Sequence, residues 1–163
     1  MILSDYMIRE RGVLVDGERR HIVEPFVERS VHETGLSFGL SHGGYDVRIK
    51  QDLTLHQGEF SLASTVEHFA IPEDVMAFVL DKSTMARQGV SCFNTCLEPG
   101  WTGFLTLEIV CHASGPVVIK AGQPIAQIVF HQMVAPPERT YAGSKYDNQA
   151  DEPVAAILEA VRP

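Results

Sequence analysis

The sequence predicts an all-β barrel or sandwich. Short apolar-rich segments follow one another from Tyr45 to Val134, and turn-forming stretches such as His56-Gln57-Gly58-Glu59 separate them. No long stretch carries the period of an amphipathic helix. Regularly spaced short strands without long helices are typical of a barrel or sandwich and not of a doubly wound sheet.

The expected elements follow the chain in order. A short helix is expected within residues 1–11, with Ser4 at its start and Gly12 as its stop. Mixed strands and loops are expected from Val13 to Ser41, where Pro25 and charged residues interrupt the apolar pieces. A short helical turn should follow the strand that ends at Leu80. The expected strands are Tyr45–Ile49, Asp52–Leu55, Phe60–Leu62, Val66–Ala70, Val75–Leu80, Gly103–Val110, Pro116–Ile119 and Ile125–Val134.

The chain divides into a β domain and an arm. With 163 residues, it is long enough to bury one core without metal or disulfide support. Residues 1–135 are expected to form this domain and residues 136–163 a C-terminal arm. The arm consists mostly of small and polar residues, and this composition predicts that it is mobile until something binds it. Its tail from Pro153 to Val161 is apolar enough to dock, as a helix or as a strand on a neighbour.

Charge and cysteine content restrict the partners. The net charge of −8 and the pI of about 5.3 argue against nucleic acid, because such binders present a basic face, but allow a small anion. The three cysteines are an odd number, and the charged N-terminus lacks a secretory apolar region. We therefore expect a cytoplasmic protein. No apolar run is long enough to span a membrane.

The residues after Leu80 are suited to holding a polyanion. Lys82, Ser83, Thr84 and Arg87 place an ammonium, two hydroxyls and a guanidinium at the end of a strand. Such groups bind phosphate oxygens through charge-assisted hydrogen bonds. The structural alternative is a surface helical turn capped by Ser83, and the residue types alone favour neither interpretation.

Glu108 is a more specific candidate for a functional residue than the turn after Leu80. On a strand from Gly103 to Val110, Phe104, Thr106 and Glu108 share one face, and Leu105 and Leu107 point to the other. A carboxylate among apolar neighbours costs free energy unless it is paired or functional. The alternative is a solvent-facing glutamate on an alternating strand, which is common.

Polar residues of the arm could also reach a ligand. Tyr141 and Tyr146 could stack or hydrogen-bond, and Lys145 and Gln149 could contact phosphate oxygens.

Several other chemistries are disfavoured. Cys92, Cys96 and Cys111 have poor spacing for zinc, and buried free thiols are the better expectation. The histidines are scattered, and the sequence lacks the zinc-deaminase pattern, the dinucleotide and P-loop glycine motifs and the nucleophile elbow.

In order along the chain, a set of segments resembles the dCTP deaminase branch of the dUTPase-like superfamily. The matching segments are Tyr45-Asp46-Val47-Arg48, Ser64 to Val75, Lys82-Ser83-Thr84-Met85-Ala86-Arg87, Glu98-Pro99-Gly100-Trp101-Thr102-Gly103, Leu105-Thr106-Leu107-Glu108, Ala121-Gly122-Gln123-Pro124-Ile125-Ala126-Gln127 and Gly143-Ser144-Lys145-Tyr146 with Gln149. The resemblance implies a distorted β-barrel or jelly-roll subunit, a homotrimer with active sites between subunits, and a C-terminal arm that closes over the nucleotide.

The resemblance also implies roles for residues. Glu108 would be the general base in the hydrolytic deamination of dCTP, Ser83 would orient the water, and Arg87 would hold Ser83, the phosphates or both. Magnesium would arrive with the nucleotide, and no zinc would be needed. The implied triphosphate contacts are Lys82, Ser83, Thr84, Arg87, Lys145 and Gln149, and the base and sugar contacts are Asn94, Thr95, Glu98, Tyr141 and Tyr146.

The sequence departs from the family in the region that would meet the base and sugar. Glu98 replaces an aspartate that contacts the sugar 3′-hydroxyl, and the tract from Gln88 to Leu97 is shorter than usual. Asn94-Thr95 is similar to the uracil-reading hairpin of dUTPases. Two alternatives therefore stay open: a dUTP pyrophosphatase or bifunctional enzyme with Glu98 as base, and a non-catalytic nucleotide-sensing trimer.

Overall fold

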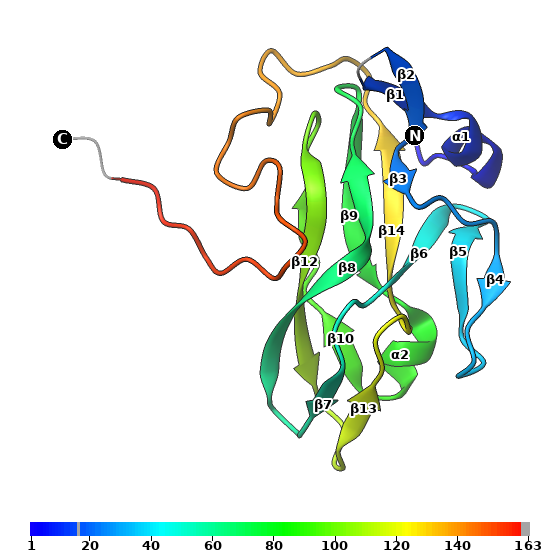
Figure 1. Cartoon of the computed structure of the whole chain (residues 1–163), viewed down its shortest axis with the longest axis vertical. Coiled ribbons are helices and arrows are strands. Elements are labelled where there is room, and N and C mark those ends of the chain that lie inside the picture. Colours follow the sequence, from blue (N-terminus) through cyan, green and yellow to red (C-terminus); the bar gives the residue numbers. More distant parts are fainter. Residues whose placement is uncertain (16, 161–163) are drawn as a thin grey trace.

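The computed structural model describes residues 1–15 and 17–160, and this part of the chain is built mainly from antiparallel strands (Figure 1). It contains two short helices, α1 (Asp5–Glu10) and α2 (Ser83–Arg87). The strands are β1 (Gly12–Val15), β2 (Glu18–His21), β3 (Val23–Glu24), β4 (Ser30–Val31), β5 (Ser37–Ser41), β6 (Gly44–Arg48), β7 (Leu53–Leu55), β8 (Phe60–Ala70), β9 (Val75–Asp81), β10 (Val90–Cys92), β11 (Cys96–Leu97), β12 (Thr102–Cys111), β13 (Val117–Ile119) and β14 (Pro124–Gln132).

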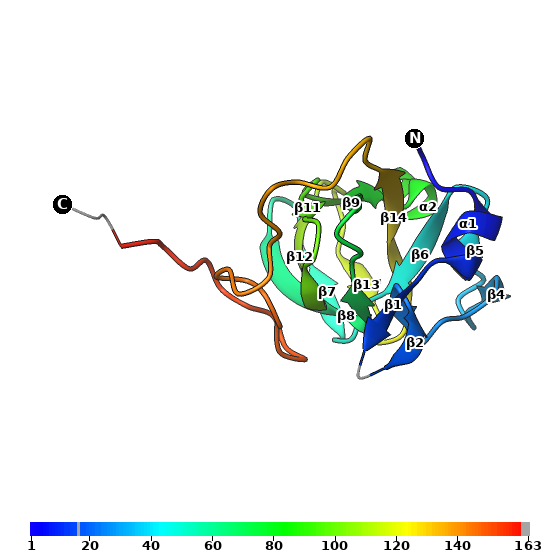
Figure 2. The ribbon, with the colours of Figure 1, turned by 90° about the horizontal axis from the view of Figure 1, so that it is seen from above.

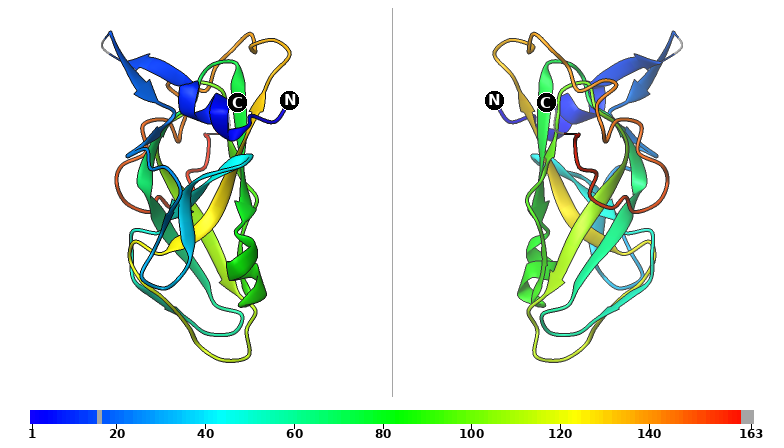
Figure 3. Two further views of the ribbon diagram at one scale, coloured as in Figure 1. Left: turned by 90° about the vertical axis from the view of Figure 1, so that its right-hand side faces the viewer. Right: turned by 90° about the vertical axis from the view of Figure 1, so that its left-hand side faces the viewer.

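Two larger sheets enclose the core. One has the order β10-β12-β8-β3 and the other the order β11-β9-β14-β6-β5-β4, while β1-β2 and β13-β7 form separate pairs. An antiparallel bridge between Ile49 and Thr65 links the two larger sheets. Seen from above and from the sides, the strands curl around a shared interior (Figures 2 and 3). The expected all-β class is confirmed.

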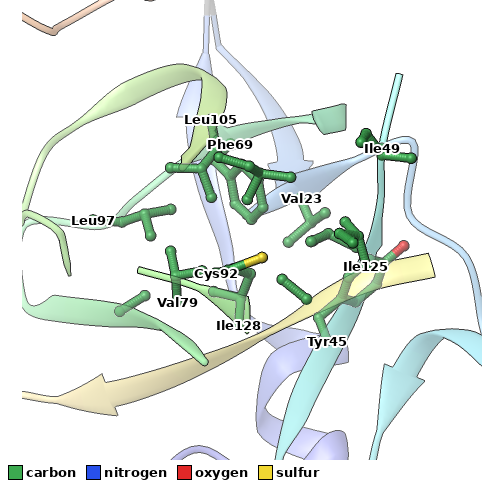
Figure 4. Packing of buried hydrophobic residues seen from close by; sticks show 14 of the residues in the cluster. Val23, Tyr45, Ile49, Phe69, Val79, Cys92, Leu97, Leu105, Ile125 and Ile128 are labelled. Carbon is green, nitrogen blue, oxygen red and sulfur yellow. The ribbon is translucent and has the colours of Figure 1, made fainter. Parts of the chain in front are cut away.

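The core lies between the inner faces of these sheets. Figure 4 shows Tyr45 and Ile128 from one sheet in the same interior as Phe69 and Leu105 from the other. Tyr45, Phe69 and Ile128 are fully buried. On β9, buried Val75, Ala77 and Val79 alternate with less buried residues, which is the period-two pattern of a strand with one face in the core.

Most expected elements are present, with shifted ends. Helix α1 begins after Ser4 as expected, although no Ser4 side chain caps it, and Gly12 opens β1 directly after the helix. The short helical turn after β9 is α2.

In the described part of the chain, no helix has the length and apolarity required to cross a membrane.

One expectation was wrong, and another is tested only in part. The segments Phe60–Leu62 and Val66–Ala70 are one continuous strand, β8, because β12 pairs with both of them. A bulge at their junction interrupts the alternation that sequence reading depends on. The tail from Pro153 to Ala160 is not the helix that was one of the two expectations, and Val161 lies outside the described residues. Its docking as a strand on a neighbour stays a prediction.

Candidate active site

Strand β12 carries the central side chain of the site. Its C-terminal half pairs with β8 on one side and with β10 on the other, and the Glu108 carbonyl accepts a hydrogen bond of 2.9 Å from the Phe93 amide. These pairings fix the backbone at Glu108. The carboxylate therefore stands at a defined position on a rigid element.

Glu108 lies in the wall of a cleft of about 600 Å³. Two carboxylates, two tyrosines and several apolar side chains face the cleft. The lining residues are Phe60, Leu62, Thr95, Cys96, Glu98, Trp101, Leu105, Thr106, Glu108, Tyr141, Tyr146, Gln149, Val154 and Ala156. The cleft therefore brings together Glu108 and five of the expected contacts, namely Thr95, Glu98, Tyr141, Tyr146 and Gln149.

Burial in the cleft raises the pKa of Glu108 above its ordinary value, and a hydrogen bond from its own backbone amide offsets only part of this effect. Desolvation favours the neutral acid, so Glu108 binds its proton more strongly than a glutamate in water does. A carboxylate of this kind is suited to taking up and returning a proton.

The arm is docked on β12 in the structure. Strand β10 pairs only with residues 109–111, so the edge of β12 near its start is free for another segment. Gln149 takes this place in a parallel bridge with Gly103, and its carbonyl accepts a hydrogen bond of 3.1 Å from the Phe104 amide. In Figure 1 the orange and red arm runs beside β12.

Side chains strengthen this docking. The Trp101 indole donates a 2.6 Å hydrogen bond to the Tyr146 carbonyl. Asp147 accepts hydrogen bonds from the backbone amides of Thr102 and Gly143. Burial would raise the pKa of Asp147, but these bonds outweigh it and hold the pKa below its usual range. At neutral pH Asp147 is therefore charged, and its hydrogen bonds join the arm to β12.

The α2 turn lies apart from the cleft. Ser83, Thr84 and Arg87 are exposed, and none of the described cleft residues belongs to α2. In Figure 1 the helix lies at the lower right of the molecule and the arm at the left. Within one chain, the structure thus does not bring the expected phosphate-binding turn to Glu108.

Lys82 differs from the rest of this turn. It is buried, and its ammonium lies 2.6 Å from the Asp46 carboxylate. Gln127 donates to the other oxygen of Asp46 at 3.1 Å. Instead of facing solvent, as a phosphate contact would, Lys82 ties α2 to β6.

Two further expected contacts lie outside the cleft lining. Asn94 is exposed. The Lys145 ammonium lies 3.5 Å from Glu159 and 5.2 Å from the ring centre of Tyr146. Lys145 is therefore near the cleft, beside one of its walls.

The cysteine expectation holds in part. Cys92 and Cys111 are buried, but Cys96 is exposed and lines the cleft. Its place at the end of the short edge strand β11 explains the exposure. Within residues 1–15 and 17–160, no three His, Cys, Asp or Glu side chains gather as metal ligands do.

Sequence reasoning missed several cleft residues. Leu105 was expected to point away from Glu108, and it is buried in the core as that alternation predicts, but it also borders the cleft. Trp101 was seen only as part of a turn. Val154 and Ala156 belong to the tail that was expected to dock, but they were not expected in the site, because no local signal marks where an irregular arm docks.

The sequence has known relatives. Residues 45–133 match a family model described as dCTP deaminase-like. The chain is 34% identical over 179 residues to a dCTP deaminase of Acidiphilium cryptum, which covers 91% of this chain and 95% of the relative. It is 32% identical over 187 residues to a dCTP deaminase of Campylobacter fetus subsp. fetus, with 96% and 98% covered.

The fold also has solved counterparts. A dUTPase from phage phi11 of S. aureus superposes with a TM-score of 0.55 at 18% identity, covering 74% of this chain and 92% of that chain. The native EIAV dUTPase gives a TM-score of 0.52 at 20% identity, covering 63% and 85%. At such identities the likeness concerns the fold, and it confirms the expected dUTPase-like architecture.

Proposed function

Because the chain belongs to the dCTP deaminase-like family, we propose that it hydrolyses the 4-amino group of dCTP and releases dUTP and ammonia. The observation that carries this proposal is Glu108. It is a partly buried carboxylate with a raised pKa, fixed on a strand in the wall of a cleft large enough for a nucleoside.

Glu108 would act as base and then as acid. Its carboxylate takes a proton from water while the oxygen attacks C4 of the cytosine ring, and it passes that proton to N3. The carboxylate then takes the proton of the hydroxyl newly bound to C4 and passes it to the amino nitrogen. The C4–N bond breaks with its electron pair on nitrogen, the C4 carbonyl forms and ammonia leaves. In the overall reaction, dCTP and water give dUTP and ammonia.

The electrostatics of the cleft support a site shared between copies of the chain. The cleft carries two carboxylates, Glu98 and Glu108, and among the described residues no lysine or arginine lines it. Such a cleft repels a triphosphate. The exposed hydroxyls and guanidinium of α2 have the opposite character. We propose that Ser83, Thr84 and Arg87 of one copy complete the cleft of another in a homotrimer.

In this assembly, Ser83 orients the attacking water, and Arg87 holds Ser83, the phosphates or both. Lys145 and Gln149 of the arm would contact the triphosphate, which brings its own magnesium as part of the substrate. We propose no zinc in this reaction. Lys82 would act on the phosphates through the position of α2, because its ammonium is already paired with Asp46.

The remaining cleft residues would hold the base and sugar. Glu98 faces the cleft from the turn before Trp101 and would accept a hydrogen bond from the sugar hydroxyl. Thr95 lies in the wall and Asn94 beside it, so both would meet the pyrimidine edge. Tyr141 and Tyr146 supply ring faces and hydroxyls from the arm side. We propose a cytoplasmic enzyme, since its three cysteines are free thiols.

One observation favours a second activity. Glu98 lies in the same cleft as Glu108, so a second carboxylate is available to activate water toward a phosphate. The alternative is therefore dUTP pyrophosphatase activity, alone or after deamination.

Product analysis separates the two activities. The purified protein is incubated with magnesium and either dCTP or dUTP, with and without a zinc-selective chelator. We expect ammonia and intact dUTP from dCTP, unaffected by the chelator. Pyrophosphate would show the second activity, and nucleotide binding without any product would show a non-catalytic nucleotide sensor.

A further inference from the structure

We propose that Thr106 is a positioning residue that couples the strand carrying Glu108 to the arm that closes the cleft. Thr106 is buried, with 6% of its surface exposed, and it lines the cleft two residues before Glu108 on β12. Its hydroxyl faces the arm and not the core. A buried hydroxyl in such a place needs partners, and the arm supplies both of them.

The hydroxyl of Thr106 acts both as a hydrogen-bond donor and as an acceptor. It donates a 3.1 Å hydrogen bond to the side-chain oxygen of Gln149 and accepts a 3.0 Å hydrogen bond from the Val154 amide. These two partners lie on either side of a bend in the arm. One side chain of β12 therefore fixes both the arm residue expected to meet substrate and the tail segment beyond it.

The bond to Gln149 also sets the direction of its amide. The oxygen end of the amide is held by Thr106, so the two N–H donors at the other end are directed away from Thr106. Donors fixed in this way suit a phosphate oxygen or another anionic acceptor of the substrate.

The bond to Val154 closes the cleft. Val154 and Ala156 both line it, and the Ile157 amide donates a 2.9 Å hydrogen bond to the Tyr146 hydroxyl. Lys50 adds an ion pair to Asp151 between the two Thr106 contacts. The tail thus adds an apolar wall to the cleft that holds Glu108.

Trp101 offers a direct test because it is the chain's single tryptophan and its indole binds the arm through Tyr146. Thr106→Val keeps the shape of the side chain and removes its hydroxyl, whereas Thr106→Ser keeps the hydroxyl. Thr54→Val is the matched control, since Thr54 is exposed on β7 far from the arm. Val154→Pro removes the amide donor and keeps an apolar side chain of similar size, and residue 154 lies in an irregular segment outside the sheets, so the barrel should still fold.

We expect Thr106→Val and Val154→Pro to increase quenching of Trp101 fluorescence by iodide in the absence of nucleotide. They should raise KM for dCTP by about tenfold, the loss expected for a hydrogen bond of this kind, with a smaller fall in kcat. Thr106→Ser should restore both values, and Thr54→Val should change neither.

The kinetic part of this test rests on the proposed function, but the fluorescence part does not. If the unmodified protein releases no ammonia from dCTP, the function is wrong while iodide quenching still tests the coupling. Unchanged quenching in both Thr106→Val and Val154→Pro would overturn the coupling, whatever the activity. If Thr106→Val does not fold, Val154→Pro decides the result alone.

Discussion

At the scale of single residues, the proposed reaction depends on whether Glu108 can exchange a proton. Glu108→Gln keeps the shape and polarity of the side chain but removes the basic oxygen. We expect turnover to fall by a factor on the order of 10² to 10⁴, the usual contribution of a general base. Nucleotide binding should survive, because the variant still lines the cleft in the same way.

The measurement pairs steady-state rates with nucleotide binding by calorimetry. Glu73→Gln is the matched control, since Glu73 is an exposed glutamate that does not line the cleft. A Glu108→Gln variant that deaminates dCTP at the rate of the control would remove Glu108 from the mechanism.

The raised pKa of Glu108 predicts a pH dependence with a definite sign. The base must be ionised to act, so kcat/KM should fall on the acid side with a midpoint above 4.5, the ordinary value for glutamate. The folded state binds this proton more strongly than the unfolded state does, so stability contributed by the group falls as pH rises from 4.5 through the folded pKa.

Carbon NMR of labelled glutamate side chains measures this pKa directly. The Glu108 signal is identified by its absence from the Glu108→Gln spectrum. A titration midpoint at or below 4.5 would contradict the desolvated site.

Single residues also show what sequence reasoning can and cannot reach. Glu108 could be singled out because a charge among leucines is costly wherever the chain folds. The burial of Lys82 could not, since its partner Asp46 is distant in sequence and belongs to another strand. The exposure of Cys96 likewise depends on which strand lies at the sheet edge, and composition does not reveal that.

At the scale of elements, the docking of the arm requires a glycine on β12. Gly103 has a φ of +132°, and a Cβ there would lie 2.5 Å from the Gln149 backbone nitrogen. Gly103→Ala should therefore displace the arm, and backbone strain in this region costs about 1–3 kcal/mol. We expect faster proteolysis of the arm and weaker nucleotide binding.

Limited proteolysis followed by mass spectrometry reports where the arm is cut. Gly115→Ala is the control, because a Cβ at Gly115 meets nothing within 4 Å and its φ is ordinary. Equal protection of the arm in the two variants would show that the Gly103 contact does not hold it.

The same strand shows the limits of period-two reasoning. Alternation correctly predicted a strand around Glu108, and the observed β12 extends it by one residue at each end. It could not foresee the bulge where β8 contributes two extra residues opposite Phe104 to Thr106. On β12 itself the alternation continues, and Leu105 is buried in the core as expected, but no pattern along the strand marks that it also borders the cleft.

At the scale of the whole molecule, the two halves of the proposed site are separated within one chain. The cleft holds the proposed base and the arm but, among the described residues, no lysine or arginine, whereas the exposed hydroxyls and guanidinium of α2, which we propose bind phosphate, lie away from the cleft. An isologous or cyclic assembly can join such halves only if each site takes one half from each of two copies. The sequence alone suggested this arrangement through resemblance, and the charge separation gives it a physical reason.

Mixing inactive variants tests this arrangement. Glu108→Gln and Ser83→Ala chains are refolded together in equal amounts, so that copies assort at random. If Glu108 and Ser83 act from different copies, half of the sites have an intact Glu108 and half of those an intact Ser83. About one quarter of the unmodified activity should therefore return. If both residues act within one chain, no activity returns.

The Glu108→Gln, Ser83→Ala double variant, mixed equally with unmodified chains, is the control for random assembly. A shared site then needs two unmodified copies and should again retain about one quarter of the activity, whereas a site within one chain retains about one half. A recovery near zero in the first mixture together with one half in the second would place the whole reaction in a single chain. The charge of the cleft would then need neutralisation by the magnesium that accompanies the triphosphate.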